Sequence, residues 1–363
     1  MTARRRGDTN PRMAGKVDVR ERLEALEDRT LHPRAARSAR SRGRARPEAP
    51  DAERPSFQRD RDRLVHSKAF RRLAGKTQVF LAPKGDHYRT RLTHTLEVAQ
   101  VARSIARALF LNEMLVEAMV MGHDLGHTPF GHAGERLLSD VVPGGFHHVV
   151  QSVRVVDVLE NDGHGLNLTA EVRDGILRHS KGRGNVLLAG TGEKALTLEA
   201  EIVRIADIVA YVNHDLDDAV RAGLFAEADV PAAIRKVLGD DRGSRFRVLV
   251  HDVIDASDVD GGGHIQMSPD VHGALLALRD FLYARVYENP VVHDEFVKAQ
   301  RILRDLWTWC LEDPARLAQR FGVEPRRGEA VERAVTDWLS GMTDRFAIAT
   351  WEPLFVPRPW GGP

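Results

Sequence analysis

The sequence predicts a mainly α-helical fold for this chain of 363 residues. Apolar side chains recur every three or four positions along several long segments, which is the spacing of one helix face. Strand-like segments do not alternate with these helical segments, and the sequence has no internal repeat. A chain of this length can form one large domain or two ordinary ones with a sizeable core.

The N-terminal part differs from the rest in charge. Residues 1–50 hold 14 Lys and Arg against 7 Asp and Glu, whereas the remaining residues hold 39 against 45. Residues 1–16 have the polar composition of a disordered segment, residues 17–29 can form one charged helix, and residues 31–55 are typical of an extended arm. We interpret residues 1–55 as a basic, partly disordered arm. It could contact nucleic acid or another subunit, or it could be only a solvated tail.

Helical patterns begin near Phe57 and follow one another along the chain. From Leu92 to Leu109 one helix face is apolar, and His94 lies at the inner end of that face. The pattern then predicts, in chain order, an apolar helix over residues 113–124, a break at Gly126 and Pro129, a short helix over 132–138, helices over 149–159 and 169–179, a glycine-rich loop over 181–194, and a long helix over 199–222.

The helix over residues 199–222 is the most regular, with an apolar side that predicts burial. Its polar stripe has steps of three or four, which keep side chains on one surface, and consists of Arg204, Asp207, Tyr211, Asp215 and Asp218. We assign residues 56–225 to the core. For the C-terminal helical region, residues 226–363, we expect helices, a weak strand-like patch around His251, a glycine turn at 261–263, and a helical pair over 267–289 and 290–311.

The composition favours a soluble globular protein, with 42% apolar and 29% charged residues. The apolar runs are far shorter than a membrane span, and the basic N-terminus lacks the apolar stretch of a signal peptide. Cys310 is the only cysteine, which excludes an intrachain disulfide and a cysteine-rich zinc site. We therefore expect a cytoplasmic protein that does not bind membranes.

The stretch from Met121 to Glu135 is rich in residues that can bind a metal or transfer protons, because it holds three histidines, an aspartate and a glutamate. Its adjacent pair, His123 and Asp124, suits a divalent metal with mixed imidazole and carboxylate ligands. An apolar helix that runs directly into this pair buries polar groups, which then need partners. His94 and Asp207 lie on other predicted helices and offer the same ligand types, although each alone could be an ordinary surface residue. The pattern indicates metal-assisted hydrolysis.

Eight motifs occur in one order between residues 57 and 220: Phe57–Asp62, His66–Leu73, Lys76–Phe80, Arg89–Val98, Gly122–Glu135, Gln151–Val156, His179–Gly182 and Ala206–Asp215. Together they resemble the HD-domain metal-dependent phosphohydrolases, and within them the bacterial deoxyguanosine triphosphate triphosphohydrolase-like family. The resemblance implies an HD-domain helical bundle with additional C-terminal helices. It also implies hydrolysis of deoxynucleoside triphosphates (dNTPs) to a deoxynucleoside and tripolyphosphate.

The resemblance also implies a role for each matching residue. The metal ligands would be His94, His123, Asp124 and Asp207, and the catalytic pair would be His132 and Glu135. The phosphates would face Arg91, His127 and His148, and the deoxyribose would face Tyr211 and Asp215. The metal would be Mn, Fe, Ni, Co or Zn, with Mg on the triphosphate. Relatives are commonly homo-oligomers with nucleotide or single-stranded DNA effectors.

Residue chemistry is consistent with several of these roles. His132 and Glu135 are three residues apart, so on a helical turn the carboxylate can hold the imidazole and favour its protonated form, which suits a general acid. Arg91 lies three residues before His94 and can point a guanidinium at a phosphate on the metal. Without the resemblance, Tyr211 and Asp215 would be interpreted as residues at the ordinary boundary between the apolar and polar faces of a helix.

Two other functions stay open. One is another phosphohydrolase on the same site, such as a nucleotidase or a cyclic-nucleotide phosphodiesterase. The other is a nucleic-acid-binding regulator with a vestigial site that acts through the basic arm.

The sequence departs from the family motif at one point near the candidate site. The segment Phe146–Val149 reads Phe-His-His-Val, where relatives often have Phe-Glu-His-Asn, and this difference places His147 beside His148.

Overall fold

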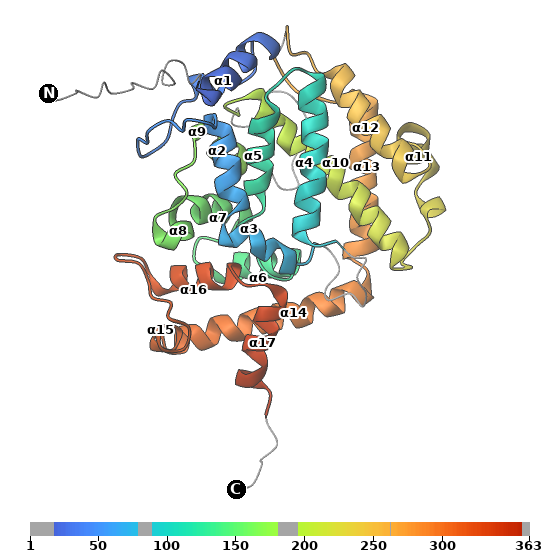
Figure 1. Cartoon of the computed structure of the whole chain (residues 1–363). Coiled ribbons are helices and arrows are strands. Elements are labelled where there is room, and N and C mark those ends of the chain that lie inside the picture. The colour runs from blue at the N-terminus through green and yellow to red at the C-terminus, as the bar shows by residue number, and fades with distance from the viewer. Residues whose placement is uncertain (1–17, 79–88, 181–194, 262, 358–363) are drawn as a thin grey trace, which may run out of the picture.

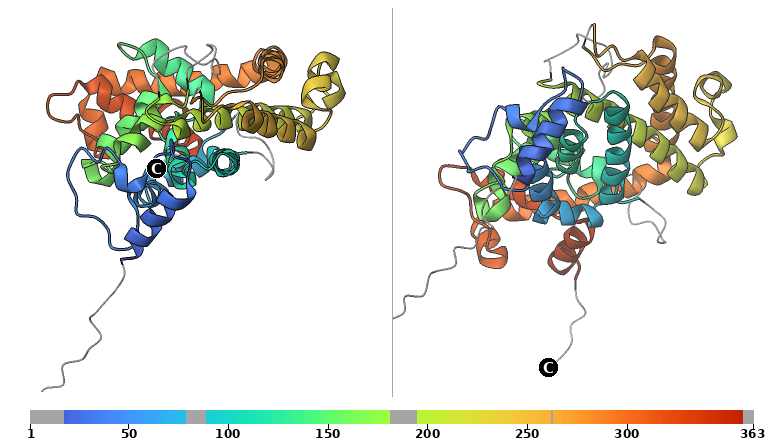
Figure 2. Two further views of the ribbon diagram at one scale, coloured as in Figure 1. Left: turned by 90° about the horizontal axis from the view of Figure 1, so that it is seen from above. Right: turned by 45° about the horizontal axis from the view of Figure 1, so that its top comes forward.

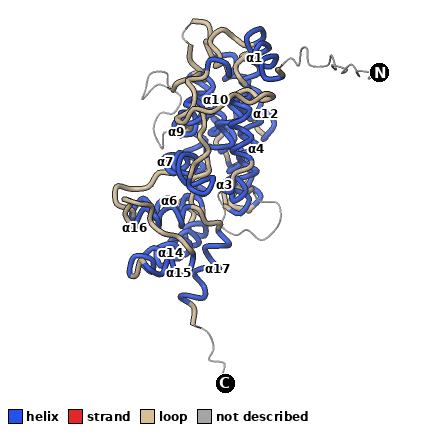
Figure 3. Tube along the Cα trace, turned by 60° about the vertical axis from the view of Figure 1, so that its left-hand side comes forward, coloured by secondary structure: helices blue, strands red, loops and turns tan. Residues whose placement is uncertain are grey.

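The computed structural model describes residues 18–78, 89–180, 195–261 and 263–357. Within these ranges the chain consists of helices and loops, with three isolated β-bridges and no strand (Figure 3). The predicted mainly α-helical fold is confirmed. The predictions for residues 1–16 and for the loop over 181–194 lie outside the described residues. In the described ranges no helix has the length and apolar character that crossing a membrane requires.

The helices vary widely in length, and the longest are α4, α10 and α14 (Figure 1). Their bounds are α1 Val19–Thr30, α2 Ser56–Val65, α3 Lys68–Arg72, α4 Arg91–Ala108, α5 Glu113–His123, α6 Gly131–Val141, α7 His148–Arg154, α8 Glu160–Gly163, α9 Ala170–Arg178, α10 Leu198–Arg221, α11 Ala232–Leu238, α12 Arg242–Ala256, α13 Pro269–Leu282, α14 Pro290–Glu312, α15 Ala315–Phe321, α16 Val331–Ser340 and α17 Asp344–Phe355. Short π-helical turns follow α7 and α13, at Val155–Leu159 and Tyr283–Tyr287.

The strand-like patch expected around His251 was wrong, because that residue lies within α12. Leu249, Val250 and Val253 are buried on one face of this helix, and their steps of one and three fit a helical period. A short apolar run cannot distinguish a strand from a buried helix segment by its pattern alone.

Three of the helices that carry site residues begin with a side-chain cap. The side chains of Thr90, Asn112 and Thr197 accept hydrogen bonds from backbone amides in the first turns of α4, α5 and α10. Such caps satisfy amides that have no partner inside the helix. They therefore fix where each of these helices starts and which residues face inward.

Two hydrophobic cores hold the chain together. In the first core, α5 contacts α2, α4, α9 and α10, while α12 and α13 pack against α10 and α11 packs against α12 and α13 (Figure 1). In the second core, α6 packs with α14, α15, α16 and α17, at the end of the molecule away from α1 (Figure 2). The helices of residues 226–363 thus divide between two cores, while the three domain boundaries remain a prediction.

The stretch from Met121 to Glu135 crosses from one core to the other. Leu125 belongs to the first core, whereas Phe130 and Ala133 belong to the second. Phe130 adopts a left-handed backbone with φ of 62°, which is unfavourable for a residue with a bulky side chain. A conformation of this kind persists only where the surrounding structure holds it in place.

The C-terminal helices supply that support. The Asp344 carboxylate, at the start of α17, accepts hydrogen bonds from the Phe130 amide at 2.8 Å and the Thr77 amide at 2.9 Å. The Lys76 ammonium is fully buried and donates to the carbonyl oxygens of His127 and of Ser340, which ends α16. The second core therefore fixes the backbone from which the site histidines project.

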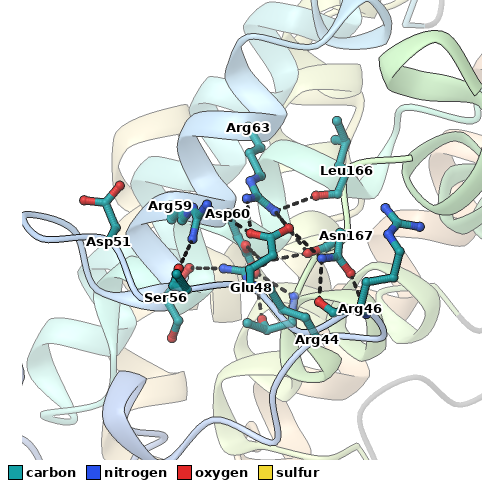
Figure 4. A network of polar contacts seen from close by, with 12 residues as sticks. Arg44, Arg46, Glu48, Asp51, Ser56, Arg59, Asp60, Arg63, Leu166 and Asn167 are labelled. Atoms are coloured by element: carbon teal, nitrogen blue, oxygen red, sulfur yellow. Dashed lines mark hydrogen bonds and ion pairs between the residues drawn. The ribbon is translucent and has the colours of Figure 1, made fainter. Parts of the chain in front are cut away.

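Residues 31–55 mostly lack regular structure, as expected, but they lie against the first core (Figure 4). Buried Asp60 accepts from Arg44 and from the amide and hydroxyl of Thr169, both at 2.8 Å. Glu48 accepts from the guanidinium of Arg63 at 2.5 Å and forms an ion pair with Arg59 at 3.0 Å. Part of the positive charge that suggested a nucleic-acid arm is thus neutralised within the protein. The predicted helix over residues 17–29 is confirmed as α1, apart from residue 17, which is not described.

We expect Asp60→Ala to destabilise the protein by about 3 to 5 kcal/mol, because it leaves the largely buried Arg44 guanidinium without its carboxylate. Urea denaturation followed by circular dichroism measures this change. Lys68→Ala is the control: it removes an ion pair with Asp162 in which both side chains are largely exposed, and it should cost less than about 1 kcal/mol. Equal, small effects of the two substitutions would contradict the role given to Asp60.

Candidate metal centre

The structure brings the four predicted metal ligands together. His94 lies in the first turn of α4, His123 ends α5, Asp124 follows it, and Asp207 lies in the middle of α10. The His94 Nε2 atom is 3.1 Å from Asp207 Oδ1, and His123 Nε2 is 3.5 Å from Asp124 Oδ1 and 3.9 Å from Asp207 Oδ1. Ligand atoms of His94, His123 and Asp124 all lie within 4.8 Å of one another. These distances fit four ligands around one ion.

The buried nitrogen of His123 provides a test of whether a cation fits. Its Nδ1–H donates to the Val120 carbonyl oxygen at 2.6 Å, so in a neutral ring the lone pair lies on Nε2. That Nε2 atom is buried and has no hydrogen-bond partner among the described residues. A buried polar atom without a partner is costly. A cation between His123 and the carboxylates would satisfy it.

The charge state of the two carboxylates also fits a cation. Burial raises the pKa of Asp124, but the charges of His123 and Arg91 outweigh burial and hold that pKa well below its usual range. Burial likewise acts against ionisation of Asp207, yet the hydrogen bond with His94 and the charge of His123 bring its pKa to about 2. Both side chains are therefore ionised at neutral pH.

Arg91 decides which side of Asp124 a metal can reach. Its buried guanidinium donates from Nη1 to Asp124 Oδ2 at 2.6 Å, so only Oδ1 is left to face the histidines. A second group of possible ligand atoms consists of Asp124, His127 and His148. In that group Arg91 already occupies Oδ2, and Glu135 already binds His148 at 2.7 Å. The set that contains His123 is therefore the better metal site.

A pocket of about 530 Å³ opens onto this centre. Of the predicted site residues it is lined by Arg91, His94, Asp124, His127, His132, Glu135, His148, Asp207 and Tyr211. His123 and Asp215 do not line it. Asp215 is fully buried and accepts a hydrogen bond from the hydroxyl group of Tyr287, and burial raises the pKa of Asp215 to about 7. Tyr287 in turn lies edge-on to the ring of His132, which lines the pocket.

The expected contact between Glu135 and His132 is corrected by the structure. The Glu135 carboxylate binds Nδ1 of His148 at 2.7 Å and accepts from the His148 amide at 3.0 Å. The His132 side chain is exposed at the pocket, but loss of solvent around its ring lowers its pKa to about 4, with the charge of Arg91 acting in the same direction. Burial also lowers the pKa of His148, but its hydrogen bond to Glu135 more than compensates and raises that pKa. The start of α7 at His148 brings this residue to Glu135, which the spacing within α6 cannot reveal.

His179 is a site residue to which the sequence analysis assigned no role. It follows α9, is buried, and lines the pocket. Its Nδ1–H donates to the Ile176 carbonyl oxygen at 2.7 Å, and its Nε2 atom is 3.2 Å from Nε2 of His148. Its ring meets the His123 ring edge-on at 5.0 Å between centroids. A histidine at the end of the helix predicted over residues 169–179 was the available signal.

The C-terminal half supplies further lining that the sequence analysis missed. Arg279 from α13 and Tyr283 from the following turn line the pocket. Arg279 and Tyr283 lie more than 60 residues beyond Asp207 in the chain, outside every recognised motif. Only the packing of α13 against α10 brings them to the site.

Known protein families match both halves of this arrangement. The HD domain matches residues 91–212, which include all four candidate ligands, and the phosphohydrolase-associated domain matches residues 265–352, which include Arg279 and Tyr283. HD domains bind divalent metal ions, and the cluster of histidines and aspartates fits such a site. The fold and the site thus define a phosphohydrolase of the HD-domain class.

Curated relatives specify the family within this class. A deoxyguanosinetriphosphate triphosphohydrolase-like protein of Desulfatibacillum aliphaticivorans is 50% identical over 349 residues, covering 94% of this chain and 99% of that protein. A deoxyguanosinetriphosphate triphosphohydrolase-like protein of Caldanaerobacter subterraneus subsp. tengcongensis is 50% identical over 344 residues, covering 95% of this chain and 98% of that protein. The chain belongs to the deoxyguanosinetriphosphate triphosphohydrolase-like family. A crystal structure of a hypothetical protein from Aquifex aeolicus aligns with a TM-score of 0.46 at 20% identity, over 82% of this chain and 68% of that one.

The contact between Glu135 and His148 predicts a pH-dependent stability. The folded state raises the pKa of His148 above its ordinary value of 6.5, so the stabilisation is complete below about pH 6.5 and is lost as pH rises through the raised pKa. In metal-free protein we expect the melting temperature of wild type to exceed that of His148→Gln by more at pH 6 than at pH 9. His251→Gln, at an exposed position on α12, is the control. An equal difference at both pH values would contradict this account.

Proposed function

We propose that this protein hydrolyses deoxynucleoside triphosphates to a deoxynucleoside and tripolyphosphate. The observation that carries the proposal is one pocket that combines a metal-ligand set with cations and aromatic rings. Its volume of about 530 Å³ lies within the range usual for small-molecule sites. Arg91 and Arg279 supply positive charge for a triphosphate, and the Tyr211 and Tyr283 rings offer surfaces for a sugar or a base.

His94, His123, Asp124 and Asp207 would hold the metal. Their mixed nitrogen and oxygen donors suit Mn, Fe, Co, Ni or Zn, while Mg suits the oxygen-rich triphosphate. A divalent ion at such a site supplies Lewis-acid polarisation of a phosphoryl oxygen and makes a neighbouring water more acidic. Phosphate binding and proton transfer would be carried out by the residues around the metal.

Two of these residues have buried polar atoms that a phosphate could satisfy. Arg91 uses Nη1 for Asp124, but its Nε has no hydrogen-bond partner among the described residues, and the same holds for Nδ1 of His127. Both side chains line the pocket. N–H groups placed where negative charge develops stabilise a phosphoryl-transfer transition state.

Proton transfer to the leaving group is assigned to the unit formed by Glu135 and His148. Water attacks the α-phosphorus, the bond from phosphorus to the 5′-oxygen breaks, and that oxygen takes a proton to become the deoxynucleoside hydroxyl. Glu135 contacts His148 directly and favours its protonated form, which suits a general acid. His132 lines the same pocket, and its neutral ring suits a hydrogen bond to substrate. The homo-oligomeric state and a nucleotide or single-stranded DNA effector remain predictions.

A substrate panel tests the reaction. Purified protein with Mn²⁺ and Mg²⁺ is incubated with each dNTP, and the products are followed by phosphorus NMR. We expect tripolyphosphate and a deoxynucleoside, because attack occurs at the α-phosphorus. Release of orthophosphate or pyrophosphate, or turnover of only nucleoside monophosphates or cyclic nucleotides, would contradict the proposal.

Asp207→Ala tests the ligand set. We expect it to remove bound metal and to lower turnover by more than the about 10- to 100-fold typical of residues outside the ligand shell. Metal content is measured by inductively coupled plasma mass spectrometry beside the dNTP assay. Asp157→Ala, which breaks a partly exposed ion pair with Arg173, is the control and should keep both properties. An Asp207→Ala protein that retains metal and turnover would remove Asp207 from the ligand set.

A further inference from the structure

A chain of three side chains leads from the metal centre towards solvent on the side away from Asp207. Nδ1 of His94 is 3.4 Å from Nδ1 of His214, and Nε2 of His214 is 3.0 Å from the Glu97 carboxylate. His214 is buried, whereas Glu97 is one-third exposed. The His94 ring therefore lies between Asp207, which meets its Nε2, and His214, which meets its Nδ1.

The helical repeat of α4 and α10 explains why these side chains lie close together. His94 and Glu97 are three residues apart on α4, and Asp207 and His214 are seven residues apart on α10. Both separations keep side chains on one helix face, and α4 packs against α10 along that face. The two imidazole rings meet edge to face, with centroids 5.6 Å apart and an interplanar angle of 87°.

The chemistry of the three groups allows one arrangement of protons that leaves His94 ready for a metal. An ionised carboxylate can only accept, so Glu97 requires the proton of a neutral His214 to lie on Nε2. Nδ1 of His214 then carries a lone pair and accepts from Nδ1–H of His94. With a metal in place of the proton that Nε2 otherwise donates to Asp207, the lone pair of His94 lies on Nε2, which faces the candidate metal position.

We propose that His214 and Glu97 are positioning residues that hold His94 in its metal-binding tautomer. Neither residue lines the pocket, so they act on the metal only through His94. Partners of this kind orient a ligand and raise its basicity, and their loss typically costs about 10- to 100-fold in metal affinity. Arg89, whose Nε lies 3.1 Å from Glu97, holds the carboxylate in place at the outer end of the chain.

The inference rests on the metal site of the proposed function but not on its substrate. It is tested on full-length protein stripped of metal with a chelator and titrated with Mn²⁺, with free Mn²⁺ measured by electron paramagnetic resonance. His214→Phe keeps a ring of similar shape but removes the acceptor. His214→Asn restores an acceptor, because the amide oxygen can take the place of Nδ1. His251→Phe, at an exposed position on α12, is the matched control.

We expect His214→Phe to weaken Mn²⁺ binding about 10- to 100-fold, with His214→Asn and His251→Phe close to wild type. Glu97→Ala should fall between them, because it leaves the tautomer of His214 unconstrained. Melting curves of the metal-free variants show whether His214→Phe is folded. If it is not, the proposal is decided by comparing the Mn²⁺ dissociation constants of Glu97→Ala and His214→Asn. Equal affinity in wild type, His214→Phe and Glu97→Ala would overturn the proposal, as would an equal loss in His214→Asn and His214→Phe. Tight Mn²⁺ binding without dNTP hydrolysis would contradict only the proposed function.

Discussion

The charges of two carboxylates, one buried and one partly buried, constrain the rest of this structure. Asp124 and Asp207 come from different parts of the chain, and both are ionised within reach of His94 and His123. A buried negative charge is costly unless a cation or several hydrogen bonds balance it. Arg91 balances one oxygen of Asp124, and the remaining ligand atoms converge on a position that suits a divalent ion. Metal binding and folding of this core should therefore be coupled.

The division of the chain into two cores explains how the site is held in place. The ligands belong to α4, α5 and α10 of the first core, whereas Glu135 belongs to α6 of the second. The two cores meet between Leu125 and Phe130, where Lys76 links the His127 carbonyl to that of Ser340 and Asp344 accepts from the Phe130 amide. The phosphohydrolase-associated domain is thus more than a covering layer, because α13 lines the pocket and α17 holds the start of α6.

Much of this could be predicted from the sequence, and the failures have physical causes. The convergence of His94, His123, Asp124 and Asp207 could be predicted, because each lies in a specific motif within or at the end of a predicted helix. The partner of Glu135 could not be predicted, because the sequence does not show which histidine lies next to its carboxylate. Only the fold shows that this residue is His148. Arg279 and Tyr283 were missed because tertiary packing alone brings α13 to the site. Asp215 was placed on the correct stripe, but its partner Tyr287 lies 72 residues away.

The most direct test of the central claim is where a metal binds. Crystals grown with Mn²⁺ and measured at the manganese absorption edge give an anomalous difference map that locates the ion independently of activity. We expect one strong peak per chain, within bonding distance of His94 Nε2, His123 Nε2, Asp124 Oδ1 and Asp207. A peak among Asp124, His127 and His148 in place of that position, or no peak near α5, would contradict the account.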